Sequence, residues 1–334
     1  MQPRISPLAQ VHPDAQLGRG TQIGPFCLIG PEVKLGDGCV LDSHIVLTGR
    51  VEIGTHNRLS AHCYLGPDPI GLITSQLDSL SKLGDGNVLF PRASVVGNSV
   101  VGDRNQLFDN VVIGRAPQDA SYKGAPTGVL VGHDNVFREN VTIHRGAEKE
   151  DGMTRVGNHN VMMENAHVGH NSQVGDSVTF ANNVAVGGHA HIHDRAVIGG
   201  NCGVHQFTTV GTLAMVGGVS RVISDALPYM MYSGNDNPRV IMVNVVGLRR
   251  SGVSESTINL LRQAFKLIWR KHLRLADVRQ QFGEVLDGII PLELANLLNA
   301  VESQNKGVSG RAREAIRDTP AFHYQQPEPQ RKVA

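Results

Sequence analysis

An aliphatic residue recurs every six positions over most of the first 222 residues, and this period constrains the fold more than any other feature. The longest unbroken run takes twelve steps up to Val222, and shorter runs cover 17–65, 83–113 and 131–143. A period of six fits neither an α-helix nor an alternating strand. It is typical of a hexapeptide β-helix, in which three hexads form a triangular coil and the aliphatic residue points inward. The sequence therefore predicts an all-β parallel β-helix of about ten coils over residues 1–224.

Three insertions interrupt the period, at residues 66–82, 114–130 and 144–155. Inward residues one coil apart stack on one another, so Leu65, Ile113 and Ile143 are expected to lie on one edge of the prism. All three insertions would then leave the scaffold at that edge. Loops on a rigid scaffold are where binding and catalytic sites are usually built.

The same edge is expected to collect polar and titratable side chains. His144 follows Ile143, and His167 and His170 flank the inward Val168. Further members follow inward residues of later coils or lie in the second insertion: Gly188, His189, His205, Gln206, Gln118 and Asp119. The remaining turn histidines are interpreted as ordinary polar turn residues: His12, His44, His56, His62, His133 and His159.

Charge and cysteine content exclude several classes of protein. The net charge is +1, which gives no bulk field for nucleic acid or an anionic membrane. The four cysteines have no metal-like spacing, and we expect no metal or other cofactor. No apolar run is long enough for a membrane span, so the expectation is a cytoplasmic protein without stable membrane insertion.

The period changes after Val222. Residues 225–253 are rich in Pro and Gly and are expected to be a connector. Helical spacing over 254–303 predicts a small α-helical domain, with helices from about Ser254, over 275–286 and over 291–302. Its basic residues are either a solvated face or a docking patch for an acidic protein. Residues 304–334 lose periodicity and are expected to be a disordered tail.

Several motifs resemble those of the UDP-N-acetylglucosamine acyltransferase family. They are TIHRG (142–146), NAHVGH (165–170), GGH (187–189), VHQF (204–207), QDASYKGAPT (118–127), MVGG (215–218) and VNVVGLRRSG (243–252). The resemblance implies a left-handed β-helix, a homotrimer, and the first step of lipid A biosynthesis. That step moves a 3-hydroxyacyl chain from acyl carrier protein to the glucosamine 3-hydroxyl of UDP-N-acetylglucosamine, with the carrier thioester as co-substrate.

The resemblance also implies roles for single residues. His170 would be the general base, beside Asn171, and the backbone N–H of Gly188 would stabilise the oxyanion. Gln118, Asp119, His144, His167 and His189 match residues that hold the sugar or line the site. His205, Gln206, Asn244 and Arg250 match contacts to the nucleotide and its diphosphate. Met215 and Gly218 lie near the family's acyl-chain ruler.

Departures from the family pattern keep other hypotheses open. The family usually has Asp where this chain has Asn171, a lysine where it has Ser121, and an acidic residue where it has Val246. The His-Asn pair also fits the N-acyltransferase of the same pathway, or a 3-amino sugar nucleotide as acceptor. From other classes, the histidines suit a zinc site like that of γ-type carbonic anhydrases, and Asn171 suits a non-catalytic nucleotide-sugar-binding scaffold.

Overall fold

The computed structural model describes residues 1–68 and 79–321. These residues form two compact units, Met1–Ser177 with the chain end from Pro320, and Val178–Thr319. Most of the predicted first insertion (residues 69–78) and the last part of the predicted tail (residues 322–334) lie outside the described residues.

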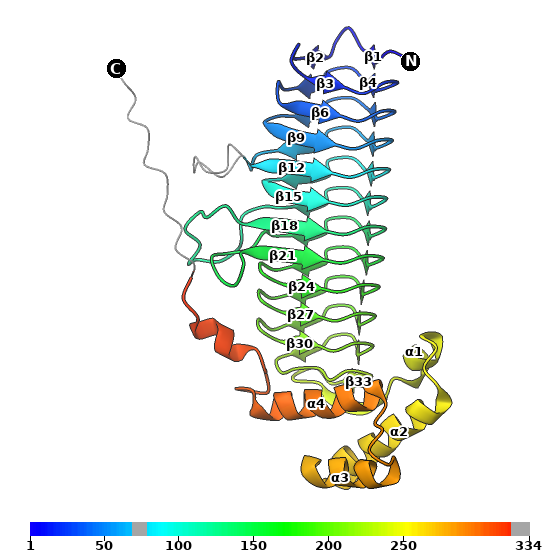
Figure 1. Cartoon of the computed structure of the whole chain (residues 1–334). Coiled ribbons are helices and arrows are strands. Elements are labelled where there is room, and N and C mark those ends of the chain that lie inside the picture. Colours follow the sequence, from blue (N-terminus) through cyan, green and yellow to red (C-terminus); the bar gives the residue numbers. More distant parts are fainter. Residues whose placement is uncertain (69–78, 322–334) are drawn as a thin grey trace. The chain divides into compact units, whose positions relative to one another are not determined.

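Unit 1 is built from three parallel sheets of short strands, which succeed one another around each coil (Figure 1). One sheet contains β1 (Arg4–Ile5), β4 (Gln22–Ile23), β7 (Val40–Leu41), β10 (Arg58–Leu59), β13 (Val88–Leu89), β16 (Gln106–Leu107), β19 (Val136–Phe137) and β22 (Val161–Met162). The second contains β2 (Gln10–Val11), β5 (Leu28–Ile29), β8 (Val46–Leu47), β11 (Tyr64–Gly66), β14 (Ser94–Val96), β17 (Val112–Ile113), β20 (Thr142–Ile143) and β23 (His167–Val168). The third contains β3 (Gln16–Leu17), β6 (Val33–Leu35), β9 (Arg50–Ile53), β12 (Leu80–Leu83), β15 (Asn98–Val101), β18 (Gly128–Val131), β21 (Met153–Val156) and β24 (Gln173–Val174).

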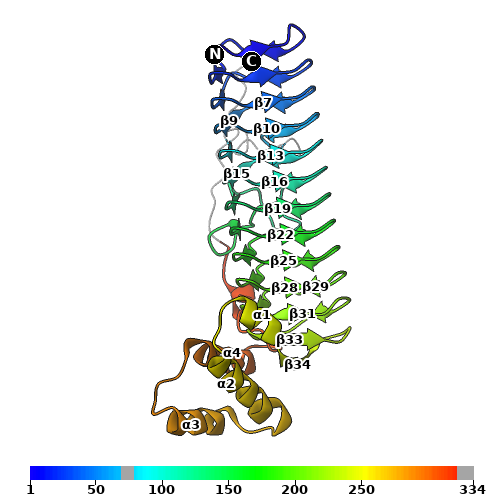
Figure 2. The ribbon, with the colours of Figure 1, turned by 90° about the vertical axis from the view of Figure 1, so that its right-hand side faces the viewer.

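The strand register confirms the predicted inward stack on the second sheet. Leu65 pairs with Val95, Val95 with Ile113, Ile113 with Ile143, and Ile143 with Val168. All five side chains are fully buried. The period of six therefore places one aliphatic residue per strand in the core, and strands β7, β10, β13 and β16 of the first sheet are stacked in the same way (Figure 2).

The coils of unit 1 begin near Arg4, within the predicted range of 1–224, because Ile5 and Val11 continue the six-residue step that runs from Leu17. Two boundaries of the insertions differ from the sequence prediction. The second and third insertions end earlier than predicted, at residues 127 and 152. The residues that follow extend β18 and β21 to four residues each, and these strands pair over their whole length from Gly128 and Met153.

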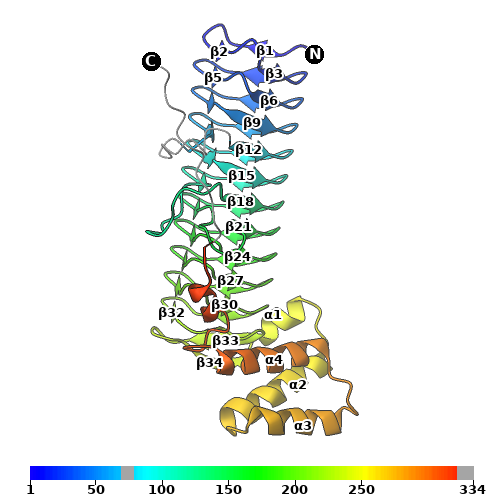
Figure 3. The same ribbon diagram turned by 60° about the vertical axis from the view of Figure 1, so that its left-hand side comes forward.

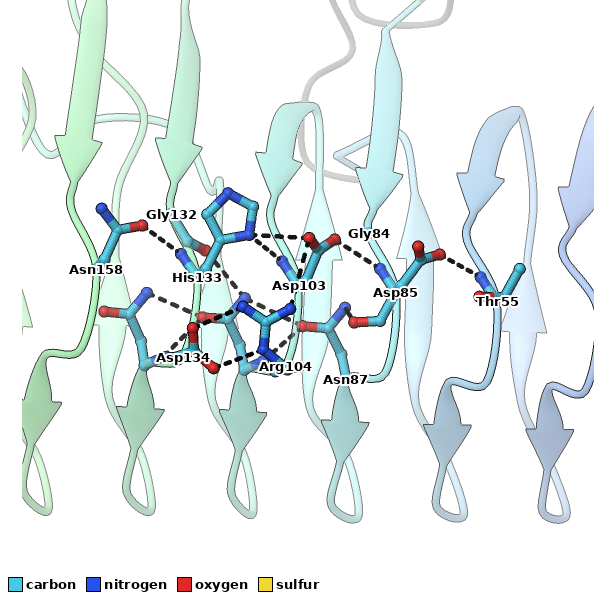
Figure 4. Close-up of polar contacts among 12 residues, drawn as sticks. Thr55, Gly84, Asp85, Asn87, Asp103, Arg104, Gly132, His133, Asp134 and Asn158 are labelled. Atoms are coloured by element: carbon cyan, nitrogen blue, oxygen red, sulfur yellow. Dashed lines mark hydrogen bonds and ion pairs between the residues drawn. The ribbon is translucent and has the colours of Figure 1, made fainter.

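Asparagine side chains line one buried corner of unit 1 as a ladder (Figure 4). The Asn87 amide donates to the Asn57 side-chain oxygen, Asn105 to Asn87, and Asn135 to Asn105, at 2.9–3.0 Å. Beside this ladder, Asp85, Asp103 and His133 accept hydrogen bonds from turn N–H groups of the preceding coil. Turn N–H groups that no strand can satisfy are thus paired. The interpretation of His133 as a turn residue is confirmed.

Unit 2 continues the same architecture with β25 (Thr179–Phe180), β26 (Ala185–Val186), β27 (His191–Ile192), β28 (Val197–Ile198), β29 (Gly203–Val204), β30 (Thr209–Val210), β31 (Met215–Val216) and β32 (Arg221–Val222). Val186 pairs with Val204, and Val204 with Val222, as the hexads predict. The described strands of the two units make ten complete three-strand coils, in agreement with the predicted number.

The second, third and fourth α-helices of unit 2 follow the sequence prediction, whereas the first lies in the predicted connector and the last helical segment lies in the predicted tail. The helical elements are α1 (Val245–Arg250), α2 (Glu255–Phe265) with a following π-turn (Lys266–Arg270), α3 (Leu275–Val285), α4 (Leu292–Lys306) and a 3₁₀ segment, η3 (Glu314–Asp318). Ser254 caps α2 through its hydroxyl, which accepts from the Thr257 N–H. In Figure 3, α2, α3 and α4 lie beside one another, and α2 and α4 bury apolar residues that include Ile258, Leu261 and Leu298.

Two expectations for the C-terminal part are corrected. The predicted connector contains a hairpin of β33 (Met230–Ser233) and β34 (Arg239–Val243), and β33 pairs with β31. It extends the sheet because Met230 and Tyr232 alternate inward. Residues 304–319 of the predicted tail are folded as part of unit 2. The Ala312 N–H donates to the Asp225 carboxylate at 2.8 Å, and the Arg311 guanidinium donates to the Ile223 carbonyl. These bonds fix a segment that has no hydrophobic period.

Candidate active site

Three histidines meet at the edge of unit 1 from which the insertions leave. The rings of His144 and His167 pack edge to face, with centroids 5.0 Å apart. Nδ1 of His167 shares a hydrogen bond with the Thr142 hydroxyl at 2.8 Å. His170 lies three residues after His167, at the turn beyond β23, and is partly exposed. The predicted histidine cluster of unit 1 is therefore present.

Burial keeps the two inner histidines neutral. Desolvation, and to a smaller extent the nearby His167, His170 and Arg145, together lower the pKa of His144 to about 4. Desolvation also lowers the pKa of His167, with His170 as the second cause. The neutral form of His144 therefore predominates at pH 7.

Asn171 is fully buried, and its amide group is held in one orientation by the third insertion. Its Nδ2 donates to the carbonyl oxygens of Ala147 at 3.3 Å and Lys149 at 2.8 Å. Its Oδ1 accepts from the Ala147 N–H at 2.7 Å and lies 2.9 Å from Nδ1 of His170. Because Oδ1 can only accept, the proton of neutral His170 lies on Nδ1. Nε2 of His170 then carries the lone pair that a general base needs.

This environment also accounts for an asparagine at position 171, where the family resemblance implies an aspartate. A carboxylate at position 171 would face the carbonyl oxygens of Ala147 and Lys149 with no proton to donate. The backbone at 171 has φ +58°, a left-handed conformation that asparagine tolerates well. The hydrogen-bonding groups of the third insertion therefore suit an amide at position 171 and do not suit a carboxylate.

We predict that Asn171→Asp destabilises the protein by about 3 kcal/mol at pH 8, the order expected for an uncompensated buried charge. Burial raises the pKa of a carboxyl group, so the folded variant retains its proton at pH values where the unfolded chain has lost it. The deficit relative to the original protein should therefore grow between about pH 5 and pH 8. Urea unfolding at several pH values measures it.

Asn183→Asp is the matched control, because Asn183 has a similar φ of +62° and an exposed side chain. Its stability should show little dependence on pH beyond that of the original protein. An Asn171→Asp protein as stable as the original at pH 8 would contradict the proposed match between amide and insertion.

A buried ion cluster joins the insertions behind these histidines. The carboxylate of Asp68 contacts the guanidinium of Arg115 at 2.7 Å and that of Arg145 at 3.0 Å, and it accepts the Ala116 N–H at 3.1 Å. The side chains of Asp68 and Arg145 are 1% and 2% exposed. Arg145 also donates to the Gly114 carbonyl at 2.9 Å. One carboxylate from the start of the first insertion thus fixes the bases of the second and third.

A second carboxylate ties the second insertion to the third. Glu148 accepts the N–H groups of Lys123 at 2.8 Å and Ala125 at 3.0 Å. In the same insertion, Asp119 accepts the Ser121 N–H and hydroxyl, both at 2.8 Å, in a tight turn, and Gln118 is exposed beside it. The two predicted sugar contacts of this insertion therefore lie on a loop with a fixed base.

The predicted site residues of unit 2 gather around Phe207. The His189 ring is buried and stacks on the Phe207 ring, with centroids 4.7 Å apart. The Phe207 N–H donates to the carbonyl of Gly188 at 3.2 Å. Nδ1 of His205 contacts the Gln206 carbonyl at 2.8 Å, so the sequence-adjacent His205 and Gln206 form one turn with the buried phenyl ring.

The remaining predicted residues of unit 2 differ in exposure. Asn244 caps α1: its Oδ1 accepts the Gly247 N–H at 3.0 Å, and its Nδ2 donates to the Leu213 carbonyl at 2.9 Å. Arg250 is exposed on the last turn of α1. Met215 is partly buried on β31, and Gly218 is exposed in the turn that follows. The Asn244 side chain thus has a structural task, because it fixes the helix that carries Arg250.

Metal ligands and membrane-spanning helices bear on the alternative classes of protein. Over residues 1–68 and 79–321, no group of three or more His, Cys, Asp or Glu side chains is arranged to hold a metal ion, so the zinc hypothesis gains no support there. Over the same residues, no helix has both the length and the apolar character that crossing a bilayer requires.

Sequence reasoning missed the residues that support the histidines. Asp68 and Arg145 are 77 positions apart, and no period relates them. A weak signal existed, because Arg145 lies within the TIHRG motif directly after a site histidine, where an unpaired charge is costly. Glu148 and Asp68 each lie in an insertion, where position gives no information on the partner.

Comparison with known proteins shows the family to which this chain is related. A family model described as UDP-N-acetylglucosamine O-acyltransferase, domain 2, matches residues 225–309. The acyl-[acyl-carrier-protein]--UDP-N-acetylglucosamine O-acyltransferase of Syntrophobacter fumaroxidans is 36% identical over 263 residues, which is 79% of this chain and 96% of that protein. The protein of the same name from Synechocystis is 39% identical over 57% of this chain and 68% of its own length.

Solved structures agree. LpxA from Acinetobacter baumannii has a TM-score of 0.59 and 33% identity, with 89% of this chain and 96% of that chain covered. The UDP-N-acetylglucosamine acyltransferase of Arabidopsis has a TM-score of 0.68 and 27% identity, with 90% and 96% covered. The fold is the left-handed parallel β-helix of these enzymes with a small C-terminal helical region. The chain therefore belongs to the acyl-[acyl-carrier-protein]--UDP-N-acetylglucosamine O-acyltransferase family.

Proposed function

We propose that the protein transfers a 3-hydroxyacyl chain from acyl carrier protein to the 3-hydroxyl of the glucosamine in UDP-N-acetylglucosamine, the first step of lipid A biosynthesis. The names of the relatives supply the donor and the acceptor. The observation that carries the chemistry is the His170–Asn171 pair, in which a buried, locked amide holds Nδ1 of His170 at 2.9 Å.

In this mechanism, Nε2 of His170 removes the proton of the sugar hydroxyl as its oxygen attacks the thioester carbonyl. A sugar hydroxyl is a poor nucleophile until that proton is taken. The tetrahedral intermediate then collapses, the carbon–sulfur bond breaks, and the imidazolium returns the proton to the thiolate of the carrier arm. Asn171 orients the imidazole but supplies no charge to stabilise imidazolium. The N–H of Gly188 is the proposed donor to the oxyanion.

The family resemblance supplies the proposed substrate contacts. Gln118, Asp119, His144, His167 and His189 would hold the sugar, and His205, Gln206 and Arg250 the nucleotide. Asn244 would act on the nucleotide through α1, whose first turn it caps. Met215 and Gly218 would limit the acyl chain. A homotrimer in the cytoplasm is part of the proposal, because one edge of a prism offers half a cleft that a second subunit can close.

The docking surface for acyl carrier protein is proposed on the basic helical region. Two of its six basic residues are already neutralised within the chain: Arg274 pairs with Asp277 at 2.9 Å, and Arg279 with Glu302 at 3.0 Å. The others of that set are Arg262, Lys266, Arg270 and Lys271. Acidic partners are attracted by such a cluster in a salt-dependent way.

The test is acyl transfer by the purified full chain from a panel of 3-hydroxyacyl carrier proteins to UDP-N-acetylglucosamine, read by product mass. One added hydroxyacyl group supports the proposal and gives the chain length. UDP-2-acetamido-3-amino-sugar and an acylated glucosamine nucleotide are tested in parallel. Transfer only to one of these would identify an amide-forming enzyme and refute the O-acyltransferase assignment, and nucleotide binding without any transfer would indicate the non-catalytic scaffold.

A further inference from the structure

Residues 310–318 lie beyond the part of the chain that the family model matches, which ends at residue 309. They contain three arginines and two acidic residues, Arg311, Arg313, Arg317, Glu314 and Asp318. The family resemblance assigns no role to any of them. Their position within unit 2 nevertheless brings them to the turn that holds His205, Gln206 and Phe207.

The segment is anchored by its first residues. Asp225 accepts the Ala312 N–H through its carboxylate at 2.8 Å and donates its own N–H to the Gly310 carbonyl at 2.8 Å. The Arg311 guanidinium contacts Glu314 at 2.5 Å, and both side chains are about nine-tenths buried. The neighbouring Arg311 lowers the pKa of Glu314, as do Arg317 and His205 to a smaller extent. Glu314 is therefore a fixed carboxylate close to the predicted nucleotide residue His205.

Arg317 is held by the Glu314 carboxylate and packs on Phe207, next to the predicted site residues His205 and Gln206. Its guanidinium contacts Glu314 at 2.8 Å and stacks over the Phe207 ring at 5.4 Å from the centroid. Phe207 in turn stacks on His189. The Arg317 side chain is 45% exposed. Two contacts thus fix a cation at the surface, one aromatic layer away from a site histidine.

We propose that the segment Arg311–Asp318 forms part of the substrate cleft and that Arg317 binds a phosphate group of a substrate. This rests on the proposed function. The two sources of phosphate in that reaction are the diphosphate of the nucleotide sugar and the phosphodiester of the carrier protein's prosthetic arm. A guanidinium carries five N–H donors in a planar fork that matches phosphate oxygens, and a fork already oriented by Glu314 and Phe207 loses little freedom on binding.

A purely structural role for the segment is the competing interpretation. The bonds of Arg311 and Ala312 serve that role fully, because they tie the chain to residues 223–225. Arg317 adds a partly exposed ion pair with Glu314 and a stacking contact with the Phe207 ring, and partly exposed contacts of these kinds contribute little to stability. The two interpretations therefore predict different effects of losing Arg317. If Arg317 binds phosphate, its loss weakens substrate binding. If its role is structural, its loss shifts the unfolding midpoint.

The experiment compares the full chain with Arg317→Gln and Arg317→Lys. The control is Arg19→Gln, which removes another exposed arginine that is paired with a carboxylate, Asp37. UDP binding is measured by calorimetry, and KM is measured separately for UDP-N-acetylglucosamine and for the acyl carrier protein. Arg317→Gln should weaken binding of the phosphate-bearing substrate about tenfold, as expected for a lost charge-assisted hydrogen bond, and change kcat less than about twofold. Arg317→Lys should fall between.

A tenfold loss of UDP affinity together with a higher KM for the nucleotide sugar assigns Arg317 to the diphosphate. A higher KM for the acyl carrier protein alone assigns it to the phosphodiester of the arm. Unchanged binding and unchanged KM for both substrates overturn the proposal, even where the unfolding midpoint shifts. A parent protein that binds UDP without acyl transfer would refute the proposed function, and calorimetry on the variants would still decide on Arg317.

Discussion

Replacing His170 with alanine is expected to lower kcat for acyl transfer by about 10²–10⁴-fold, the usual contribution of a general base. The sugar hydroxyl would have to react without proton removal, while the remaining substrate contacts stay in place. KM for UDP-N-acetylglucosamine should therefore change by no more than about threefold. Steady-state kinetics with product detection by mass measures both quantities.

The comparison needs a histidine that lies outside the candidate site. His12 occurs in the first coils and has a half-exposed side chain, so His12→Ala should retain the activity of the original protein. Unfolding curves of both variants show whether any loss of activity comes from a loss of folded protein. A His170→Ala enzyme with more than about one-tenth of the original kcat would contradict the assignment of His170 as the base.

Asp68→Ala is expected to destabilise the protein by about 3–5 kcal/mol, the cost of removing one partner from a buried ion pair. Arg145 would remain with a side chain that is 2% exposed and no carboxylate beside it. Arg115 and the Ala116 N–H would lose the same acceptor. Because Asp68 joins the bases of the insertions, acyl transfer should fall together with stability. Denaturant unfolding and the transfer assay test the two effects.

Asp236→Ala gives the contrast for this prediction. Asp236 pairs with Arg221 at 2.6 Å, but both side chains are about two-thirds exposed, and exposed pairs contribute little. Its unfolding midpoint should stay at that of the original protein. If Asp68→Ala unfolds at the same denaturant concentration as Asp236→Ala, the buried cluster does not hold the insertions.

The β-helix could be predicted from the sequence because each hexad repeats the same local pattern, in which one aliphatic residue must be buried in the core. That rule alone pairs Ile113 with Ile143 and Leu65 with Val95, although the partners are 30 positions apart, and the strand register confirms both pairs. The same rule located the edge from which the insertions leave. Helix α2 was equally accessible, since Ser254 and the apolar stripe mark its start and its buried face.

The support of the site could not be predicted, for a physical reason. Asp68 and Arg145 are brought together by the geometry of stacked coils, and a single charge in a loop gives no indication of its partner. The lock on Asn171 depends on backbone carbonyls, which every residue carries. The ordered segment after α4 is fixed by a few hydrogen bonds, such as that from Ala312 to Asp225, without any apolar pattern.

The mechanism depends most on His170 presenting an unprotonated Nε2, and ¹⁵N NMR of the full chain with labelled histidine measures this directly. The chemical shifts of the two ring nitrogens distinguish the tautomers, and His170→Gln assigns the signal. We predict that neutral His170 carries its proton on Nδ1, donated to the Asn171 side-chain oxygen, and that Asn171→Ala yields a mixture of tautomers. A neutral His170 with its proton on Nε2 in the original protein would contradict the account, because that nitrogen could not then accept the hydroxyl proton.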